Sequence, residues 1–243
     1  LGIRVGIIGV GGIGGVVGGM MTKGGHDVTL IDTWPEHIEI MNRDGLRITE
    51  PNGEHLVRVN AVHVHELQSV AESFDYGFVA VKSYDTDWAS AMINEHVNPD
   101  GAIVVFQNGI NDERVAKIVG ADRTVGCVIT IGAGIYEAGH VVRTDTNDIG
   151  FKIGEQHGHD TPRAREIAEL VSSVAPAQVT NNLWGERWAK MAVNCMANPI
   201  AGLTGLGSAE LRTDTEARRI SIHISAETIS VARALGHVVE PLF

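Results

Sequence analysis

The stretch that decides the fold, residues 3–14, reads IRVGIIGVGGIG. Its apolar first half is typical of a buried parallel strand, and the break at Gly9 opens the pattern G-x-G-x-x-G before a helix expected over residues 12–23. In this pattern Gly9 permits a tight turn, Gly11 lets backbone amides approach a pyrophosphate, and Gly14 allows close packing of helix on strand. The helix N-terminus adds unpaired N–H groups and a partial positive charge. The stretch therefore predicts a dinucleotide site.

An acidic residue closes the next expected strand, residues 27–31, and supports this interpretation. Asp32 follows Gly14 by 18 residues, close to the spacing of the residue that holds a cofactor ribose. A chain with 29 glycines can produce the pattern by chance, so the alternative is a glycine-rich turn without a ligand. The strand, the helix and the acid together favour a cofactor site. We expect it to contain Gly9, Val10, Gly11, Gly12, Ile13, Gly14 and Asp32.

Composition excludes several classes of protein and partner. The 243 residues carry a formal charge of −11, which argues against nucleic acid and against an anionic membrane surface. No apolar run approaches the roughly 18 residues that span a bilayer. Cys127 and Cys195 lie in apolar segments without metal or redox spacing, so we expect buried free thiols in a cytoplasmic protein. The histidine pairs at residues 63/65 and 157/159 lack a convincing third ligand, and no metal is expected.

Strands and helices alternate along most of the chain, which predicts an α/β fold. We expect a Rossmann-type doubly wound parallel sheet in a dinucleotide-binding domain, residues 1–180, and an all-helical substrate and catalytic domain, residues 181–243. Residues 46–49 and 56–64 are expected to form an antiparallel excursion, residues 124–132, 141–144 and 149–153 a strand with a hairpin pair, and residues 176–182 an interdomain connection. The helical domain is predicted to hold helices over residues 183–201, interrupted near Pro199, and 208–235.

Three polar residues recur at helical spacing in the first of those helices. Lys190, Asn194 and Asn198 stand at i, i+4 and i+8 and therefore share one face. Because residues 191–209 contain no charge, we expect this helix to be buried nearly all round. Buried polar groups need partners, and a pocket for a polar ligand would supply them. The alternative is an ion pair of Lys190 with Glu186 and asparagines that pack or cap the helix.

Taken together, the motifs resemble the ketopantoate reductase family (2-dehydropantoate 2-reductases). The matching elements stand in the family's order over nearly the whole chain: G-x-G-x-x-G, Val81-Lys82-Ser83, Gln107-Asn108-Gly109, and Trp188-Ala189-Lys190 followed by Asn194 and Asn198. The resemblance implies that Lys190 is catalytic and that Asn194 and Asn198 bind the substrate. It also implies that Lys82 and Asn108 lie beside the nicotinamide, with Asn108 contacting the substrate as well.

The implied activity is reduction of a 2-oxo acid, ketopantoate by family default, to the 2-hydroxy acid with a nicotinamide cofactor, in pantothenate biosynthesis. Hydride delivery to a ketone leaves an alkoxide that needs a proton donor, a role that a lysine can fill. One alternative is a dehydrogenase of the same family that acts on another oxo or hydroxy acid. Another is a nucleotide-binding sensor without catalysis. A homodimer is the expected assembly.

The sequence departs from the family in three places. Many relatives carry an arginine after the second strand for the 2′-phosphate of NADPH, whereas this chain has Thr33 there and Asp32 before it, so we expect NADH to be preferred and NADPH to remain possible. Family members continue with helices that contribute a serine and a glutamate, but the sequence stops at Phe243, so we expect the helical domain to be truncated. Residues 139–144 match the family's strand only loosely, and Arg143 is expected to be a surface residue of a hairpin, with binding of a substrate carboxylate as the alternative.

Overall fold

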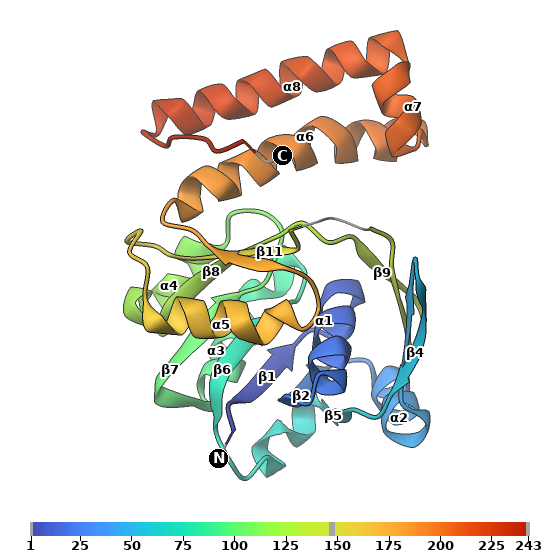
Figure 1. Ribbon diagram of the computed structural model, residues 1–243, viewed down its shortest axis with the longest axis vertical. Coiled ribbons are helices and arrows are strands. Elements are labelled where there is room, and N and C mark those ends of the chain that lie inside the picture. Colours follow the sequence, from blue (N-terminus) through green and yellow to red (C-terminus); the bar gives the residue numbers. More distant parts are fainter. Residues whose placement is uncertain (1, 146–148, 242–243) are drawn as a thin grey trace. The chain divides into compact units, whose positions relative to one another are not determined.

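The computed structural model describes residues 2–145 and 149–241. The chain divides into two compact units, Leu1–Asn181 and Asn182–Phe243. The first is an α/β unit and the second is helical, which confirms the predicted fold class (Figure 1).

A mostly parallel sheet forms the centre of the first unit (Figure 1). Its strand order is β12-β11-β8-β7-β6-β1-β2-β5. From β5 to β8 all neighbours are parallel, and the order reverses between β1 and β6, which is the switch point of a doubly wound sheet. The strands are β1 (Arg4–Ile8), β2 (Asp27–Asp32), β5 (Asn60–His63), β6 (Phe74–Val79), β7 (Val97–Val105), β8 (Thr124–Ile129), β11 (Phe151–Glu155) and β12 (Ala177–Val179).

Both faces of this sheet are buried, because alternate residues of each central strand point to opposite sides. Ile7 on β1 belongs to one apolar cluster, and its neighbour Ile8 belongs to a second one. Phe78 and Val79 on β6 divide in the same way. The helices of this unit are α1 (Gly12–Lys23), α2 (Pro35–Asp44), α3 (Thr86–Asn94), α4 (Asp112–Val119) and α5 (Pro162–Ser172).

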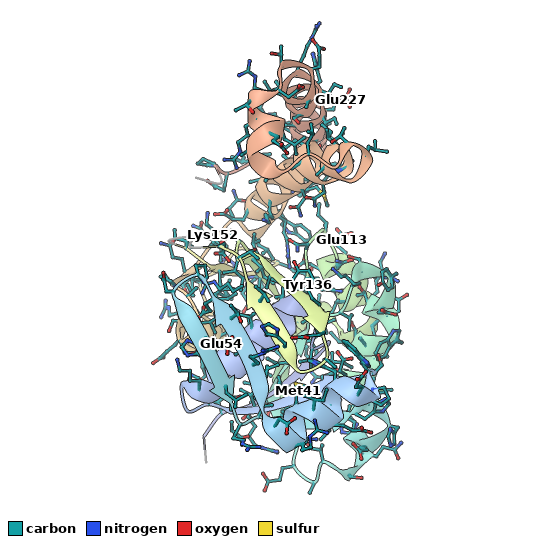
Figure 2. The ribbon with its side chains drawn as sticks, turned by 90° about the vertical axis from the view of Figure 1, so that its right-hand side faces the viewer. Met41, Glu54, Glu113, Tyr136, Lys152 and Glu227 are labelled. Carbon is teal, nitrogen blue, oxygen red and sulfur yellow. The ribbon has the colours of Figure 1, made fainter. Side chains whose placement is uncertain are left out.

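A second, four-stranded sheet joins two excursions that are far apart in the sequence. It has the order β4-β3-β10-β9, in which β3 (Leu46–Glu50) pairs in parallel with β10 (His140–Arg143). The outer strands are β4 (Gly53–Val57) and β9 (Ala133–Glu137). Glu54 on β4 and Tyr136 on β9, both exposed, mark this sheet in Figure 2.

Helix α1 is packed against both sheets, which explains why five of its twelve residues are glycine. A Cβ atom on Gly18 would lie 2.3 Å from Leu30 of the large sheet, and one on Gly19 would lie 2.5 Å from Ile48 of the small sheet. Each glycine costs about 1 kcal/mol of helix propensity relative to alanine. A larger side chain at either position would have to displace Leu30 or Ile48, both fully buried, and this close approach to both sheets offsets the cost of the glycines.

The second unit is built from α6 (Leu183–Thr204), α7 (Ser208–Thr213) and α8 (Thr215–Ala234). Asn182 caps α6 by accepting the Gly185 N–H at 3.0 Å, and its amide donates to the Val238 carbonyl at 2.9 Å. The segment after α8 is thereby tied to the start of α6. Within the described residues, no helix has the length and apolar character needed to cross a lipid bilayer.

The helical predictions were wrong in three respects. Residues 208–235 form two helices, because Asp214 ends α7 and its carboxylate caps α8 by accepting the Ala217 N–H at 2.8 Å. Pro199 does not interrupt α6, which continues to Thr204 and ends at Gly205. Nor is α6 buried nearly all round, since its apolar Leu203 is 88% exposed. Uncharged composition alone did not indicate burial.

Two predictions about strands were also wrong, and one was incomplete. Residues 56–64 belong to two strands in different sheets, because β5 pairs with β2 rather than with its chain neighbour β4. Residues 141–144 and 149–153 do not form a hairpin: β10 pairs with β3 and β9, and β11 pairs with β8. Residues 176–182, expected as the interdomain connection, contain the boundary between the two units, but they also include β12, which pairs with β11 at the edge of the large sheet.

Candidate active site

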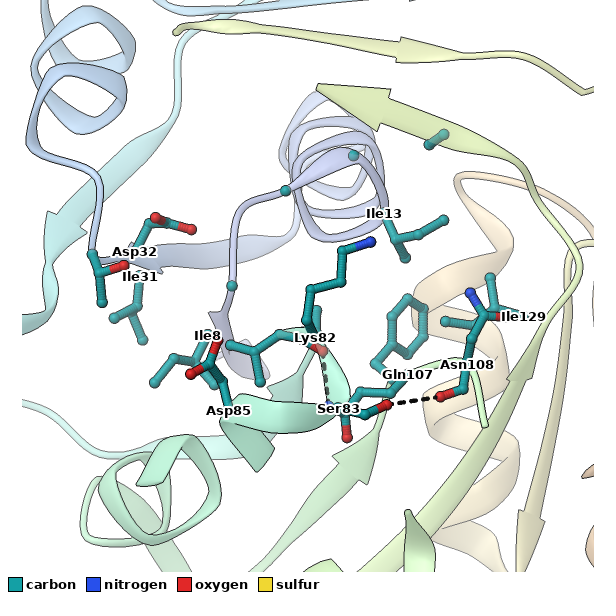
Figure 3. A pocket seen from close by; sticks show the side chains of 18 of the residues that line it. Ile8, Ile13, Ile31, Asp32, Lys82, Ser83, Asp85, Gln107, Asn108 and Ile129 are labelled. Carbon is teal, nitrogen blue, oxygen red and sulfur yellow. Dashed lines mark hydrogen bonds between the residues drawn. The ribbon is translucent and has the colours of Figure 1, made fainter. Parts of the chain in front are cut away.

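A pocket of about 280 Å³ opens at the carboxyl ends of the parallel strands, next to the switch point (Figure 3). Residues after β1, β2, β6 and β7 form most of its wall. Ligands of open α/β sheets bind at this edge. Of the predicted cofactor residues, the wall contains Gly9, Gly11, Gly12, Ile13, Asp32, Lys82 and Asn108, whereas Val10 and Gly14 do not line it.

The three motif glycines serve different physical purposes. Gly9 has a φ of +98°, a conformation that side chains rarely adopt, and its N–H donates to the Ile31 carbonyl at 2.8 Å. A Cβ on Gly14 would lie 2.0 Å from the Gly9 carbonyl oxygen, so helix and turn are in direct contact. A Cβ on Gly11 would meet no atom within 4 Å. Gly9 and Gly14 are thus required by the fold, while Gly11 leaves open space at the pocket wall.

Asp32 cross-links the glycine turn to the segment after β2. One carboxylate oxygen accepts the Val10 N–H at 2.6 Å, and the other accepts the Trp34 N–H at 2.9 Å. Each carboxylate oxygen has a further lone pair that can accept, and Asp32 lines the pocket together with Thr33. Asp32 therefore has a structural role in addition to the ligand role expected from its spacing.

His37, which no sequence pattern indicated, holds the same turn in place through its buried ring. It lies on α2 with no exposed surface, and its ring stacks against Trp34. Its Nδ1 accepts the Gly139 N–H at 2.7 Å, so the ring proton resides on Nε2 and is donated to the Val10 carbonyl at 3.0 Å. Burial lowers the pKa of His37, although the nearby Asp32 carboxylate opposes the shift. The neutral imidazole thus joins the turn to the β9–β10 connection.

The free energy of unfolding is expected to fall below about pH 6.5 because of His37. The unfolded state binds a proton at the ordinary histidine pKa of about 6.5, whereas the folded state, with its lowered pKa, does not. Above that pH His37 does not reduce the free energy of unfolding. As the pH drops toward the folded-state pKa, the free energy of unfolding decreases by at most about 1.4 kcal/mol per pH unit. Urea unfolding at pH 7.5 and 5.5 measures this decrease, which should be smaller in a His37→Gln variant than in the wild-type protein. Equal losses would contradict the assignment.

Buried amides join the two loops that carry Lys82 and Asn108. Gln107, which is 4% exposed, donates to the Val81 carbonyl at 2.8 Å. Asn111 donates to the Ser83 hydroxyl and to the Asn108 carbonyl, each at 3.1 Å. These bonds fix the loop after β6 to the loop after β7. Figure 3 shows the Lys82 side chain extending into the pocket toward Ile13. The positioning role of Gln107 and Asn111 was not foreseen.

The remaining predicted residues lie in the second unit or outside the pocket wall. Lys190, Asn194 and Asn198 occupy successive turns of α6 and share one of its faces. Arg143 is not a surface residue as predicted: its side chain is 10% exposed and pairs with Glu50 and Asp145 at 3.2 and 3.3 Å.

The two cysteines and the two histidine pairs were the other residues considered as possible redox or metal ligands. Cys127 is buried on β8, but Cys195 is only half-buried, contrary to expectation. The rings of the 63/65 and 157/159 histidine pairs lie 4.4 and 5.0 Å apart. Among residues 2–145 and 149–241, no three histidine, cysteine or acidic side chains form a group that could hold a metal.

A doubly wound sheet with a glycine turn at its switch point defines a nucleotide-binding α/β protein. The comparisons with known proteins are specific about its family. The profile "Ketopantoate reductase PanE/ApbA" matches residues 5–156, and "Ketopantoate reductase PanE/ApbA C terminal" matches residues 182–242. The chain belongs to the ketopantoate reductase family, and it is therefore an oxidoreductase of the class that acts on CH–OH groups with a nicotinamide cofactor.

Individual relatives agree with this assignment. The chain is 31% identical to a 2-dehydropantoate 2-reductase of Halobacterium salinarum, over 96% of this chain and 76% of the relative. Two solved structures share the fold. A 2-dehydropantoate 2-reductase from Geobacter metallireducens has a TM-score of 0.88 at 24% identity, and the match covers 98% of this chain and 77% of the chain in that structure. D-mandelate dehydrogenase, solved with NADH and anilino(oxo)acetate, has a TM-score of 0.88 at 21% identity, with coverages of 98% and 76%.

Proposed function

We propose that this protein reduces a 2-oxo acid, ketopantoate by family default, to the corresponding 2-hydroxy acid, with NADH as the preferred reductant. The observation that carries the proposal is the pocket at the carboxyl ends of the strands, whose wall combines the glycine turn with Lys82 and Asn108. The family is named for ketopantoate reduction, and its Halobacterium salinarum relative is a 2-dehydropantoate 2-reductase, which supports ketopantoate as the substrate. Consumption of NADH in the presence of ketopantoate, followed by absorbance, tests the activity.

The pocket residues fit a dinucleotide. The N-terminal N–H groups of an α-helix lack partners within the helix, and Gly11, Gly12 and Ile13 bring the start of α1 into the pocket wall. Open space beside Gly11 allows a pyrophosphate to approach the backbone. Lys82 adds a positive charge to the same wall. In this assignment Gly9, Val10 and Gly14 shape the turn, and Asp32 accepts hydrogen bonds from the ribose.

The proposed chemistry divides between the two units. When bound, the nicotinamide supplies a hydride to the carbonyl carbon of the substrate. Lys190 acts as the general acid that donates a proton to the developing alkoxide oxygen. Asn194 and Asn198, on the same face of α6, hold the polar groups of the oxo acid without adding charge, and Asn108 binds substrate as well as cofactor. In this proposal the first unit binds the dinucleotide, and the second supplies the acid and the substrate amides.

NADH is expected to bind more tightly than NADPH by a factor of about 10 or more, because the Asp32 carboxylate repels a 2′-phosphate. Asp32→Asn removes this charge while keeping an oxygen that can accept one of the two backbone N–H groups. The ratio of the two dissociation constants, measured by calorimetry, should therefore move toward NADPH. Equal affinities of the wild-type protein for both cofactors would contradict the proposed preference.

A reductase of the same family with a different oxo acid is the second candidate. D-mandelate dehydrogenase shares the fold and was solved with anilino(oxo)acetate, so proteins of this fold bind 2-oxo acids that differ in their substituents. A panel of 2-oxo acids assayed with NADH separates the two candidates by kcat/KM. The formal charge of −11 favours small molecules over nucleic acid as binding partners. We also propose that the protein forms a homodimer and is located in the cytoplasm.

A further inference from the structure

Asp85 occupies a helix-capping position but does not cap the helix. It is the N-cap residue of α3, where an aspartate ordinarily accepts an N–H of the first turn, and no such side-chain bond is present. Its Oδ1 accepts the Trp88 indole N–H at 2.8 Å instead. Among residues 2–145 and 149–241, no group donates a hydrogen bond to Oδ2. This carboxylate is thus held in place by Trp88 with one oxygen still able to accept.

Asp85 lies at one end of the pocket already described. Asp85 and Trp88 both line it, as do Ile31, Asp32 and Val64. Figure 3 shows Asp85 at the same end of the pocket as Asp32, Ile31 and Ile8, to one side of Lys82. Trp88, which bonds to Asp85, and Val64 supply apolar surface to the same pocket wall, and each of them remains partly exposed. An apolar wall next to an acceptor is suited to a flat heterocycle that carries a hydrogen-bond donor.

The charges of the pocket decide which part of the cofactor this end receives. Among the described residues of its wall, Lys82 is the only basic side chain, and Asp32 and Asp85 are the only acids. Phosphates therefore belong near Lys82 and the start of α1, and the acidic end belongs to the adenosine. A carboxylate only accepts hydrogen bonds. Adenosine offers donors at its ribose hydroxyls and at the exocyclic amino group of the base, and Asp32 is placed for the ribose.

We propose that Oδ2 of Asp85 accepts a hydrogen bond from the exocyclic amino group of the cofactor's adenine and so selects an amino-bearing base. The inference rests on the proposed function, because it requires that the pocket binds an adenine dinucleotide. It assigns base specificity to a residue outside the glycine motif. A base with a carbonyl oxygen at that position would place two acceptors against each other and bind more weakly.

The test compares NADH with its hypoxanthine analogue, nicotinamide hypoxanthine dinucleotide, in which a carbonyl replaces the amino group. Isothermal calorimetry on the whole chain, without substrate, measures both dissociation constants. The wild-type protein should bind NADH about 10-fold more tightly. In Asp85→Asn the amide oxygen can still accept the Trp88 N–H while the NH₂ group faces the pocket as a donor, so the preference should reverse toward the analogue. Asp85→Ala should bind both ligands with similar affinity.

Glu36→Gln is the matched control, because it removes one negative charge at an exposed position of α2 outside the pocket wall. It should keep the wild-type preference, and thermal unfolding of each variant verifies that it is folded. Equal affinity of the wild-type protein for both ligands, or an unchanged preference in Asp85→Asn, would overturn the inference while leaving NADH binding intact. Failure of the wild-type protein to bind NADH at all would instead overturn the proposed function, and this inference with it.

Discussion

Replacing Lys190 with alanine is expected to lower kcat for ketopantoate reduction by about 10³-fold, because general acid catalysis by a positioned side chain typically contributes 10²- to 10⁴-fold. The dissociation constant for NADH should stay unchanged, since the residues proposed to bind the cofactor lie in the first unit. Stopped-flow absorbance and calorimetry on the same preparation separate these two quantities.

Lys117→Ala provides the control for Lys190→Ala, because Lys117 is an exposed lysine on α4 outside the pocket wall. It should retain wild-type turnover. Small primary amines added to the Lys190→Ala enzyme should restore part of the activity if the lost group is a proton donor. A Lys190→Ala enzyme with full turnover would exclude this residue as the acid. If the wild-type protein and the variant both bind NADH but neither reduces an oxo acid, the protein would be a sensor.

Gly14→Ala is expected to lower the free energy of unfolding by about 3 kcal/mol or more. Alanine would improve helix propensity by about 1 kcal/mol, but its Cβ would lie 2.0 Å from the Gly9 carbonyl oxygen. Backbone atoms cannot move aside as a flexible side chain does, and Gly9 is itself fixed by its bond to Ile31. The clash therefore exceeds the usual cost of overpacking, 1 to 3 kcal/mol. Urea denaturation measures the loss.

Gly11→Ala is the informative partner of this variant. No atom lies within 4 Å of the added Cβ, and the backbone at Gly11, with φ of −73°, is open to any residue. Its stability should equal that of the wild-type protein, while the methyl group in the pocket weakens NADH binding about 10-fold. If Gly11→Ala lowered stability as much as Gly14→Ala, the glycines would serve the fold alone, and the pocket would lose its best evidence for a pyrophosphate.

Local patterns in the sequence predicted the large sheet well. Apolar runs that end in glycine or in a polar residue mark β1, β2, β6 and β7, and the structure confirms the doubly wound arrangement. The same strand ends placed Asp32, Lys82 and Asn108 at one edge, and all three line one pocket. Their contacts with a cofactor stay a prediction, as do the roles of Lys190, Asn194 and Asn198.

Pairings between distant segments could not be read in the same way. The small sheet forms because β3 pairs with β10, which is more than ninety residues away in the chain. The sequence of β9 does not alternate apolar and polar residues, so it gives no indication of a strand. The partners of His37 are the backbone atoms of Val10 and Gly139, which leave no trace in the identity of the side chains. Single-residue signals such as these become visible only once the chain is folded.

The packing of α1 between two sheets has a consequence for how quickly a ligand can bind. A helix held by close backbone contacts on opposite sides has little freedom to tilt or slide, so its terminal amides keep one orientation before any ligand arrives. The entropy needed to arrange those amides is lost during folding rather than at each encounter. Association should therefore occur in a single kinetic phase whose rate rises linearly with ligand concentration.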